Sequence, residues 1–325
     1  MIKCIKNERR NVMSFLYFLE GIRNSVLDAL FSVITICGEE TVFMAVGMII
    51  FWCFSKYQGY YLLCTGFVGT AINQFLKMLC RVPRPWVKDP NFTIVESARE
   101  AATGYSFPSG HTQTSVGLFG GIARWNKGKV LRGIMIALCV LVPLSRMYLG
   151  VHTPADVCVS LGIALFLVFA LYPLFRKAEK SPVTMYAILS AITVVVILFL
   201  CFVSLYPFPA DVYTEANVHN LNSAEKNAFT LLGCLVGLIV IYTVDIKFTH
   251  FDTKAVWWAQ IIKVVIGIGL VLAVKEGMRS PLEAIIGHEL IARAVRYFLM
   301  VVVGGGLWPM SFKYFARLGK KQEVK

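Results

Sequence analysis

Three polar motifs in the first half of the chain contain the residue types that bind an anion and react with it. The first motif includes Lys77 and Arg84-Pro85, the second is Pro108-Ser109-Gly110-His111, and the third joins Ser145-Arg146 to His152 and Asp156. Together they supply three fixed cations, two histidines, one carboxylate and a glycine at a predicted helix start. Lysine carries a compact charge and arginine a planar fork of donors, and both together suit a phosphate. The motifs therefore predict a site that holds a phosphate and attacks its phosphorus through histidine.

The first motif places two cations beside the predicted outer end of an apolar helix. Lys77 lies near that end, and Asn73 lies one turn below it on the same face. Arg84 follows a break in the helix at Pro83. Taken alone, this motif leaves an alternative open, in which Lys77, Arg81 and Arg84 only anchor the helix among lipid headgroups.

The second motif directly precedes an apolar segment and has the composition of a helix start. A Ser109-Gly110 pair there leaves backbone N–H groups free at the positive end of the helix dipole. Glycine also lets the backbone approach an oxyanion closely, and His111 can reach the ester oxygen of a bound phosphate. A plain serine N-cap beside an interfacial histidine explains the same residues equally well when the motif is taken alone.

The third motif spaces a histidine and a carboxylate by one helical turn. His152 and Asp156 are four residues apart, so both lie on one face if a helix begins there. A carboxylate behind an imidazole fixes its tautomer and stabilises its cation, which makes His152 a candidate nucleophile. A helix-start aspartate with a bystander histidine is the alternative. Of the five histidines in the chain, we expect His219, His250 and His288 to be structural or surface residues.

The rest of the chain has the composition of an integral membrane protein. Hydrophobic residues make up 57% of its 325 residues and charged residues only 16%, below the roughly 25% of soluble domains. Its mean hydropathy is +0.66. We therefore expect an all-α integral membrane fold, a bundle of about nine transmembrane helices. The predicted spans lie near 41–57, 59–79, 110–124, 130–149, 156–175, 182–205, 228–246, 257–275 and 288–310.

Residues 13–37 differ from these spans because charged residues interrupt their apolar residues at helical spacing. Such a pattern predicts an amphipathic helix that lies in the membrane interface. An ordinary spanning helix buried in the bundle is the alternative, and the sequence does not decide between them.

Cationic residues in short loops predict which side of the membrane each loop faces. The loops near 124–132 and 176–180 and the C-terminal tail are basic. By parity they fall on one side together with the segment 245–254, and we expect that side to be cytoplasmic. All three motifs then fall on the external side of a multi-pass protein of the cell membrane. The basic N-terminus obeys this rule only if residues 13–37 span the membrane; its cations are Lys3, Lys6, Arg9 and Arg10.

The net charge of +13 does not indicate nucleic-acid binding, because most of it lies in short loops that flank apolar spans. The nine cysteines have neither paired nor metal-type spacing, so we expect no disulfide and no zinc site. No cluster of Asp and Glu is available to hold a metal, and we expect neither a metal nor another cofactor. The expected partner is a membrane lipid substrate, and a homodimer is left open as an assembly.

A soft boundary near 178–182 follows the last of the three motifs. We therefore predict a catalytic membrane core at residues 1–178 and a C-terminal transmembrane extension of unknown role at 179–325. In the extension, Glu289, Arg293 and Arg296 lie at helical spacing just inside the last predicted span. An i, i+4 pair between Glu289 and Arg293 is one explanation, and a second contact to a lipid headgroup is the other.

In order and spacing, the three motifs resemble the signature of the type-2 phosphatidic acid phosphatase superfamily. The resemblance covers about residues 15–178. It implies metal-independent hydrolysis of a phosphate monoester or diphosphate through a phosphohistidine intermediate. By the same resemblance, His152 is the nucleophile, Asp156 is its partner, and His111 is the general acid that protonates the leaving group. The implied phosphate-binding residues are Lys77, Arg84, Ser109, Gly110 and Arg146.

A site at the level of the headgroups, between spans, meets amphiphiles far more often than soluble phosphates. The expected function is therefore hydrolysis of a lipid phosphate or diphosphate at the external membrane face. Candidate substrates are undecaprenyl diphosphate, phosphatidic acid, phosphatidylglycerol phosphate and sphingoid phosphates. Two alternatives stay open: a phosphotransferase that passes the group to an alcohol, and a transporter or scaffold that binds lipid phosphate without cleaving it.

Overall fold

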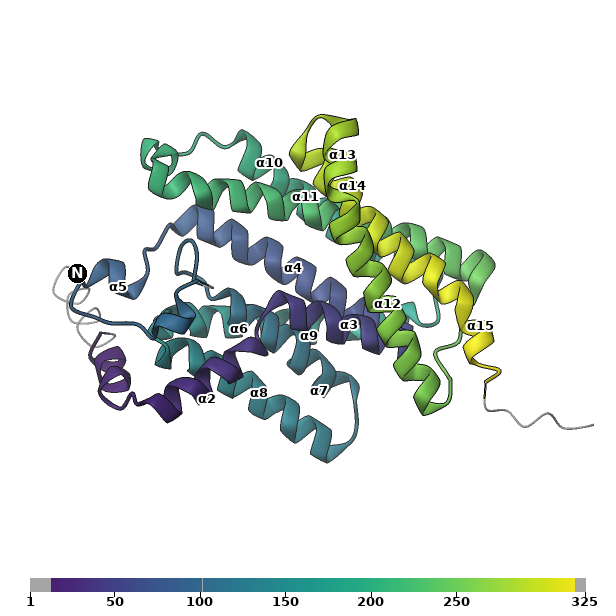
Figure 1. The fold of residues 1–325 in the computed structure, drawn as a ribbon, viewed down its shortest axis with the longest axis horizontal. Coiled ribbons are helices and arrows are strands. Elements are labelled where there is room, and N and C mark those ends of the chain that lie inside the picture. The colour runs from purple at the N-terminus through teal and green to yellow at the C-terminus, as the bar shows by residue number, and fades with distance from the viewer. Residues whose placement is uncertain (1–12, 101, 319–325) are drawn as a thin grey trace, which may run out of the picture. The chain divides into compact units, whose positions relative to one another are not determined.

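A computed structural model describes residues 13–100 and 102–318, and every regular element in these two ranges is a helix (Figure 1). The long helices are α4 (Lys56–Cys80), α8 (Lys129–Tyr148), α9 (Pro154–Ala178), α10 (Pro182–Leu205), α11 (Glu215–Val244) and α12 (Trp257–Gly277). The shorter helices are α2 (Ser25–Ile36), α3 (Glu40–Cys53), α5 (Pro85–Lys88), α6 (Gly110–Ser115), α7 (Gly121–Trp125), α13 (Arg279–Ile286), α14 (Glu289–Val302) and α15 (Phe312–Phe315). The prediction of an all-α membrane protein is confirmed.

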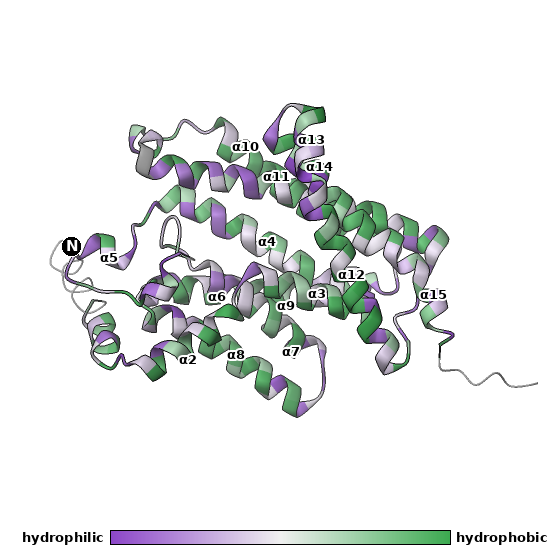
Figure 2. Cartoon of the chain, in the orientation of Figure 1, coloured by the Kyte–Doolittle hydropathy of each residue, from purple (hydrophilic) through white to green (hydrophobic). Residues whose placement is uncertain are grey.

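Seven helical stretches in the described ranges are long and apolar enough to cross a membrane, or up to eight if the bent pair α2 and α3 is one span. Figure 2 shows hydrophobic residues along most of these helices and hydrophilic residues mainly in loops and at helix ends. The predicted number of about nine spans is therefore approximate, and the described residues contain seven or eight candidates. Residues 110–125 consist of α6, a π-helical turn at Val116–Gly120 and α7, which together are shorter than the roughly 20 residues that a crossing requires.

The predicted single helix at 13–37 is in fact two helices. Residues 13–21 are helical, the chain turns at 22–24, and α2 begins after Asn24. The Asn24 side chain accepts hydrogen bonds from the backbone N–H groups of Val26 and Leu27 at 3.1 and 3.0 Å, so it caps α2 and separates the two helices. The location of this segment in the interface stays a prediction. The basic N-terminal cluster, with Lys3 and Lys6, and the end of the basic tail lie outside the described residues.

The chain forms two compact units that alternate along the sequence. Among the described residues, the first unit comprises 13–44, 65–172 apart from residue 101, and 205–224, and the second comprises 45–64, 173–204 and 225–318. All three motifs lie in the first unit. The division into a core at 1–178 and an extension at 179–325 stays a prediction about domains.

In the first unit, apolar burial holds the long loop between α5 and α6 against the end of α8. Tyr148 and Leu149, at the end of α8, pack with Val151 against Ala98 and Ala102 of that loop. All five side chains are buried. Because the burial of apolar surface stabilises a contact in proportion to its area, this cluster fixes the backbone of the loop beside the motifs.

In the second unit, the predicted pair between Glu289 and Arg293 is replaced by contacts to α11. Glu289 forms an ion pair with Lys226 at 2.8 Å. The Arg293 Nε donates to Thr230 Oγ1 at 2.7 Å and to the carbonyl of Lys226 at 3.2 Å. Glu289 and Arg293 therefore bind a neighbouring helix of the same unit, a partner that i, i+4 spacing cannot reveal, and the third charged residue of α14, Arg296, donates to the carbonyl of Lys275 at 3.5 Å.

Candidate active site

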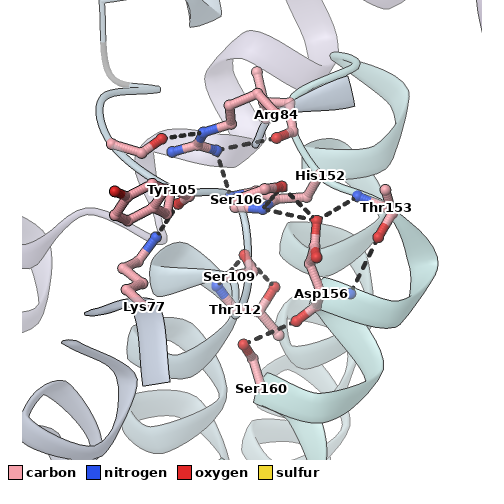
Figure 3. A network of polar contacts seen from close by, with 12 residues as sticks. Lys77, Arg84, Tyr105, Ser106, Ser109, Thr112, His152, Thr153, Asp156 and Ser160 are labelled. Carbon is pink, nitrogen blue, oxygen red and sulfur yellow. Dashed lines mark hydrogen bonds and ion pairs between the residues drawn. The ribbon is translucent and has the colours of Figure 1, made fainter. Parts of the chain in front are cut away.

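Three consecutive carbonyls of the loop before α6 hold the two cations of the first motif. Lys77, in the last turn of α4, donates from Nζ to the carbonyl of Tyr105 at 2.6 Å. Arg84 donates from Nε to the carbonyl of Gly104 at 3.0 Å and from Nη2 to that of Thr103 at 2.7 Å (Figure 3). These carbonyl partners are neutral, so they orient both side chains without cancelling their charge.

Arg84 also contacts the ring of His152 and thereby identifies its tautomer. Its Nη1 lies 3.0 Å from Nε2 of His152 and 3.0 Å from the carbonyl of Val151. A guanidinium can only donate, so Nε2 must accept with its lone pair, and the ring proton of the neutral imidazole is on Nδ1. The Nδ1 atom lies 3.5 Å from Oδ2 of Asp156 (Figure 3). Nε2 is therefore the unprotonated nitrogen of the ring, and its lone pair accepts from Arg84 in this structure.

Asp156 accepts hydrogen bonds from two groups besides its contact with His152. Its Oδ2 accepts from Oγ of Ser106 at 2.5 Å and from the backbone N–H of Thr153 at 2.8 Å. In return, Oγ1 of Thr153 accepts from the backbone N–H of Asp156 at 3.3 Å. This reciprocal arrangement is a capping box at the start of α9. The carboxylate that faces His152 therefore also accepts a hydrogen bond from the backbone at the start of a helix. Both residues are buried, with exposed fractions of 1% for Asp156 and 2% for His152.

The second motif forms the start of α6, as its composition predicts. Oγ of Ser109 accepts from the backbone N–H of Thr112 at 3.4 Å and from its hydroxyl at 3.0 Å, so Ser109 is the N-cap. The next residue, Gly110, has no atom within 4 Å of the position that a Cβ would occupy. His111 follows in the first turn, and its buried Nε2 has no hydrogen-bond partner among the described residues.

Arg146, in the last turn of α8, is the third cation of the site. It is 1% exposed, its Nη1 donates to Oγ1 of Thr35 at 2.8 Å, and its buried Nε has no partner among the described residues. The corner between α2 and α3 adds a wall to the site. A Cβ on Gly38 would lie 3.0 Å from Cβ of His111 and 2.8 Å from Cγ1 of Val142, so the backbone passes closely beside the histidine.

These groups surround one cavity of about 180 Å³ within the first unit, here called the phosphate cavity. Ser109 and Asp156, two of the predicted site residues, do not line it and instead act behind it, as a helix cap and as the partner of His152. The predicted residues that line the cavity are Lys77, Arg84, Gly110, His111, Arg146 and His152; its other lining residues are Gly38, Glu40, Thr103 and Thr114.

Burial and the surrounding charges lower the pKa of both histidines. Burial, followed by the Arg84 guanidinium, lowers the pKa of His152 well below 6.5, although Asp156 opposes the shift. Burial also lowers the pKa of His111 to about 3, with Arg146, Arg84 and Lys77 acting in the same direction. Because a bound phosphate dianion would offset those three cations, binding it favours the protonated form of His111.

Several contributors to the site were not predicted from the sequence. The carbonyls of 103–105 and the close approach of Gly38 have no residue-type signature. Ser106 and Thr35 are ordinary hydroxyl residues that only the fold brings to Asp156 and Arg146. Thr153 is different, because a threonine three residues before Asp156 and ahead of an apolar run is the sequence signal of a capping box.

Comparison with known proteins places the chain in a family. A model of the PAP2 superfamily matches residues 57–180, the range that contains all three motifs. A model of the PAP2 superfamily phosphatase transmembrane extension matches residues 229–321. Undecaprenyl-diphosphatase BcrC of Bacillus subtilis (strain 168) is 31% identical over 180 residues, which are 52% of this chain and 88% of that protein. The chain belongs to the PAP2 superfamily.

A second relative is named for a different lipid phosphate. A probable sphingosine-1-phosphate phosphatase of Dictyostelium discoideum is 29% identical over 165 residues, which are 47% of this chain and 39% of that protein. No solved structure matches the chain. This PAP2 protein is thus a phosphatase with several apolar helices that can cross a membrane, and the predicted family is confirmed.

Proposed function

We propose that this PAP2 phosphatase hydrolyses a lipid phosphate or diphosphate, such as undecaprenyl diphosphate or phosphatidic acid, through a phosphohistidine intermediate on His152. The names of its relatives support substrates of this class, because one is an undecaprenyl-diphosphatase and the other a probable sphingosine-1-phosphate phosphatase. The cations and backbone groups around the phosphate cavity support recognition of the phosphoryl group.

In the first step, Nε2 of His152 attacks phosphorus, and the bond from phosphorus to the leaving oxygen breaks. The imidazole becomes cationic as it attacks, and the nearby carboxylate of Asp156 stabilises that charge. His111 gives its proton to the leaving oxygen. The transferred phosphoryl group spreads negative charge over three oxygens, and Lys77, Arg84 and Arg146 stabilise this charge.

In the second step, water attacks the phosphorus of the phosphohistidine and the bond from phosphorus to nitrogen breaks. His111, now neutral, removes a proton from this water and returns to its starting state. Phosphate leaves, and His152 regains its lone pair on Nε2. Each histidine is therefore restored after one turnover, and the reaction needs no group beyond the substrate and water.

We further propose that the site faces the external side of the cell membrane. The excess of cations in the loops near 124–132 and 176–180 supports this orientation. The third motif lies at the other ends of the same helices, at the end of α8 and the start of α9. A lipid headgroup in the external leaflet would then lie at the level of the site.

The observation that carries the proposal is the contact of 3.0 Å between Nη1 of Arg84 and Nε2 of His152. When a phosphate oxygen replaces Nε2 as the acceptor for this guanidinium, the lone pair of Nε2 is released next to the bound phosphate. The test is phosphate release from a panel of purified lipid phosphates in detergent and chelator. His152→Asn should abolish release, whereas His250→Asn, at an exposed residue of the second unit, should retain it. Release that persists in His152→Asn would contradict the mechanism.

A further inference from the structure

A second cavity, of about 70 Å³, adjoins the phosphate cavity within the first unit. Lys77 and Thr103 line both cavities. The remaining lining residues of the second cavity come from α4, from the loop 103–105 and from the first turns of α11; they are Gln74, Met78, Gly104, Tyr105, His219, Asn220 and Ser223. None of the predicted site residues except Lys77 lies there.

The loop 103–105 borders both cavities at Thr103 and lines the second cavity with Gly104 and Tyr105. Its carbonyls accept hydrogen bonds from Lys77 and Arg84, while Gly104 has a positive φ of 71°. A Cβ on Gly104 would lie 2.9 Å from Oδ1 of Asn220, so the glycine lets the start of α11 approach the loop closely. Asn220 therefore packs against the loop whose carbonyl groups orient Arg84.

A salt bridge links the segment just before α11 to the end of α4. Arg81, just past the end of α4, donates from Nη1 to both carboxylate oxygens of Asp211 at 2.7 and 2.9 Å. The carbonyl of Asp211 in turn accepts from the side chains of Thr214 and Asn217 at 2.9 Å each. The start of α11, which carries His219, Asn220 and Ser223, is thus linked through Asp211 to Arg81 at the end of α4.

The lining of this cavity suits an anion with hydrogen-bonding oxygens. Lys77 is its one formal charge, and no carboxylate lines it among the described residues. Amides of Gln74 and Asn220 supply further donors. The hydroxyl of Tyr105, a residue that is 7% exposed, lies near Asn220 and makes no hydrogen bond of good geometry with the described residues. An apolar tail would leave these polar groups unsatisfied, and an ammonium group would meet Lys77 without any counter-charge.

We propose that the second cavity binds the second phosphate of a lipid diphosphate while the terminal phosphate occupies the phosphate cavity. The inference rests on the proposed function and specifies its substrate class. Lys77 lies between the two cavities, and an ammonium has three donors of which Tyr105 takes one, so the others can reach both phosphates. Attack by His152 on the terminal phosphorus then breaks the bond to the bridging oxygen, and the lipid monophosphate leaves from the second cavity.

The test compares two isosteric charge changes on one helix. Asn220→Asp places a negative charge in the second cavity, whereas Asn222→Asp places it at an exposed residue of α11 that does not line the cavity. Hydrolysis of farnesyl diphosphate and farnesyl phosphate, which share a tail, is measured for both variants and the unchanged protein. The ratio of kcat/KM for the diphosphate to that for the monophosphate should fall by about tenfold or more in Asn220→Asp only.

Gln74→Glu carries the same charge change to the opposite wall of the cavity and should reproduce the loss. As a binding readout, inorganic pyrophosphate should inhibit monophosphate hydrolysis about tenfold less well in Asn220→Asp, with inhibition by orthophosphate changed less than about twofold. An unchanged ratio in Asn220→Asp, in a protein that cleaves both substrates, would overturn the subsite alone. A lack of cleavage of every lipid phosphate by the unchanged protein would overturn the proposed function instead.

Discussion

The hydroxyl of Thr35 accepts a hydrogen bond of 2.8 Å from Nη1 of Arg146, so helix α2 touches the third cation of the phosphate cavity directly. Thr35 lies outside residues 57–180, the range matched by the PAP2 model. The N-terminal segment therefore contributes to the site through a positioning residue that the three motifs do not include.

Replacing Thr35 with valine keeps the shape of the side chain and removes the acceptor. We expect kcat/KM to fall about fivefold, because a hydrogen bond to a charged group contributes about 1 kcal/mol or more. Thr35→Ser retains the oxygen and should recover most of the activity. Steady-state kinetics with one lipid phosphate provides the measurement. A loss of activity in Thr35→Ser with little loss in Thr35→Val would show that the methyl group rather than the hydroxyl is needed.

Asp156→Asn should reduce kcat by roughly 10²-fold or more, because an amide in place of the carboxylate neither fixes the Nδ1–H tautomer nor stabilises the imidazolium. Ser106→Ala removes only one of the hydrogen bonds to Asp156 and should cost about fivefold. KM should change little in either variant. A larger loss in Ser106→Ala than in Asp156→Asn would assign the serine a direct part in the reaction.

Substitution by alanine should lower the stability of the protein at one glycine of the site and leave it unchanged at another. Gly38→Ala pushes a methyl group against His111 and Val142, and we expect about 1–3 kcal/mol of destabilisation together with lost activity. Gly110→Ala meets no protein atom within 4 Å and should leave the melting temperature nearly unchanged. Because Gly110 lines the phosphate cavity, its methyl group should still raise KM. Thermal melting in detergent, measured beside kinetics, separates the two effects.

The pH dependence of kcat should be bell-shaped. His152 must be neutral to attack, and its lowered pKa places the acidic limb below pH 6.5, since the imidazole is deprotonated above its pKa. His111 must be protonated in the substrate complex, so activity falls again at alkaline pH when it loses its proton. Rates measured from acid to alkaline pH at saturating substrate test this division of roles, and a rate that rises steadily with pH would contradict it.

The sequence was sufficient to predict which polar side chains the fold brings to one cavity, but not the backbone that orients them. Lys77, His111 and His152 could be predicted because charged and imidazole side chains are rare among apolar segments. The carbonyls of the loop 103–105 could not, since any residue supplies a carbonyl and only the apolar cluster around Leu149 places this loop. The break at Asn24 was missed for a related reason: an apolar repeat at helical spacing continues across it, whereas the cap depends on a single side chain.

Lys77 and Arg84 are oriented by carbonyl groups and one imidazole, rather than by carboxylates, among the partners that the structure describes. The orientation of both side chains is therefore achieved without neutralising them, and the low-dielectric surroundings leave their field poorly screened. We expect such a field to reach beyond contact distance and to enrich anionic headgroups over neutral ones at the entrance of the cavity before any of them binds. The loop that aligns the cations would then also bias which lipids arrive.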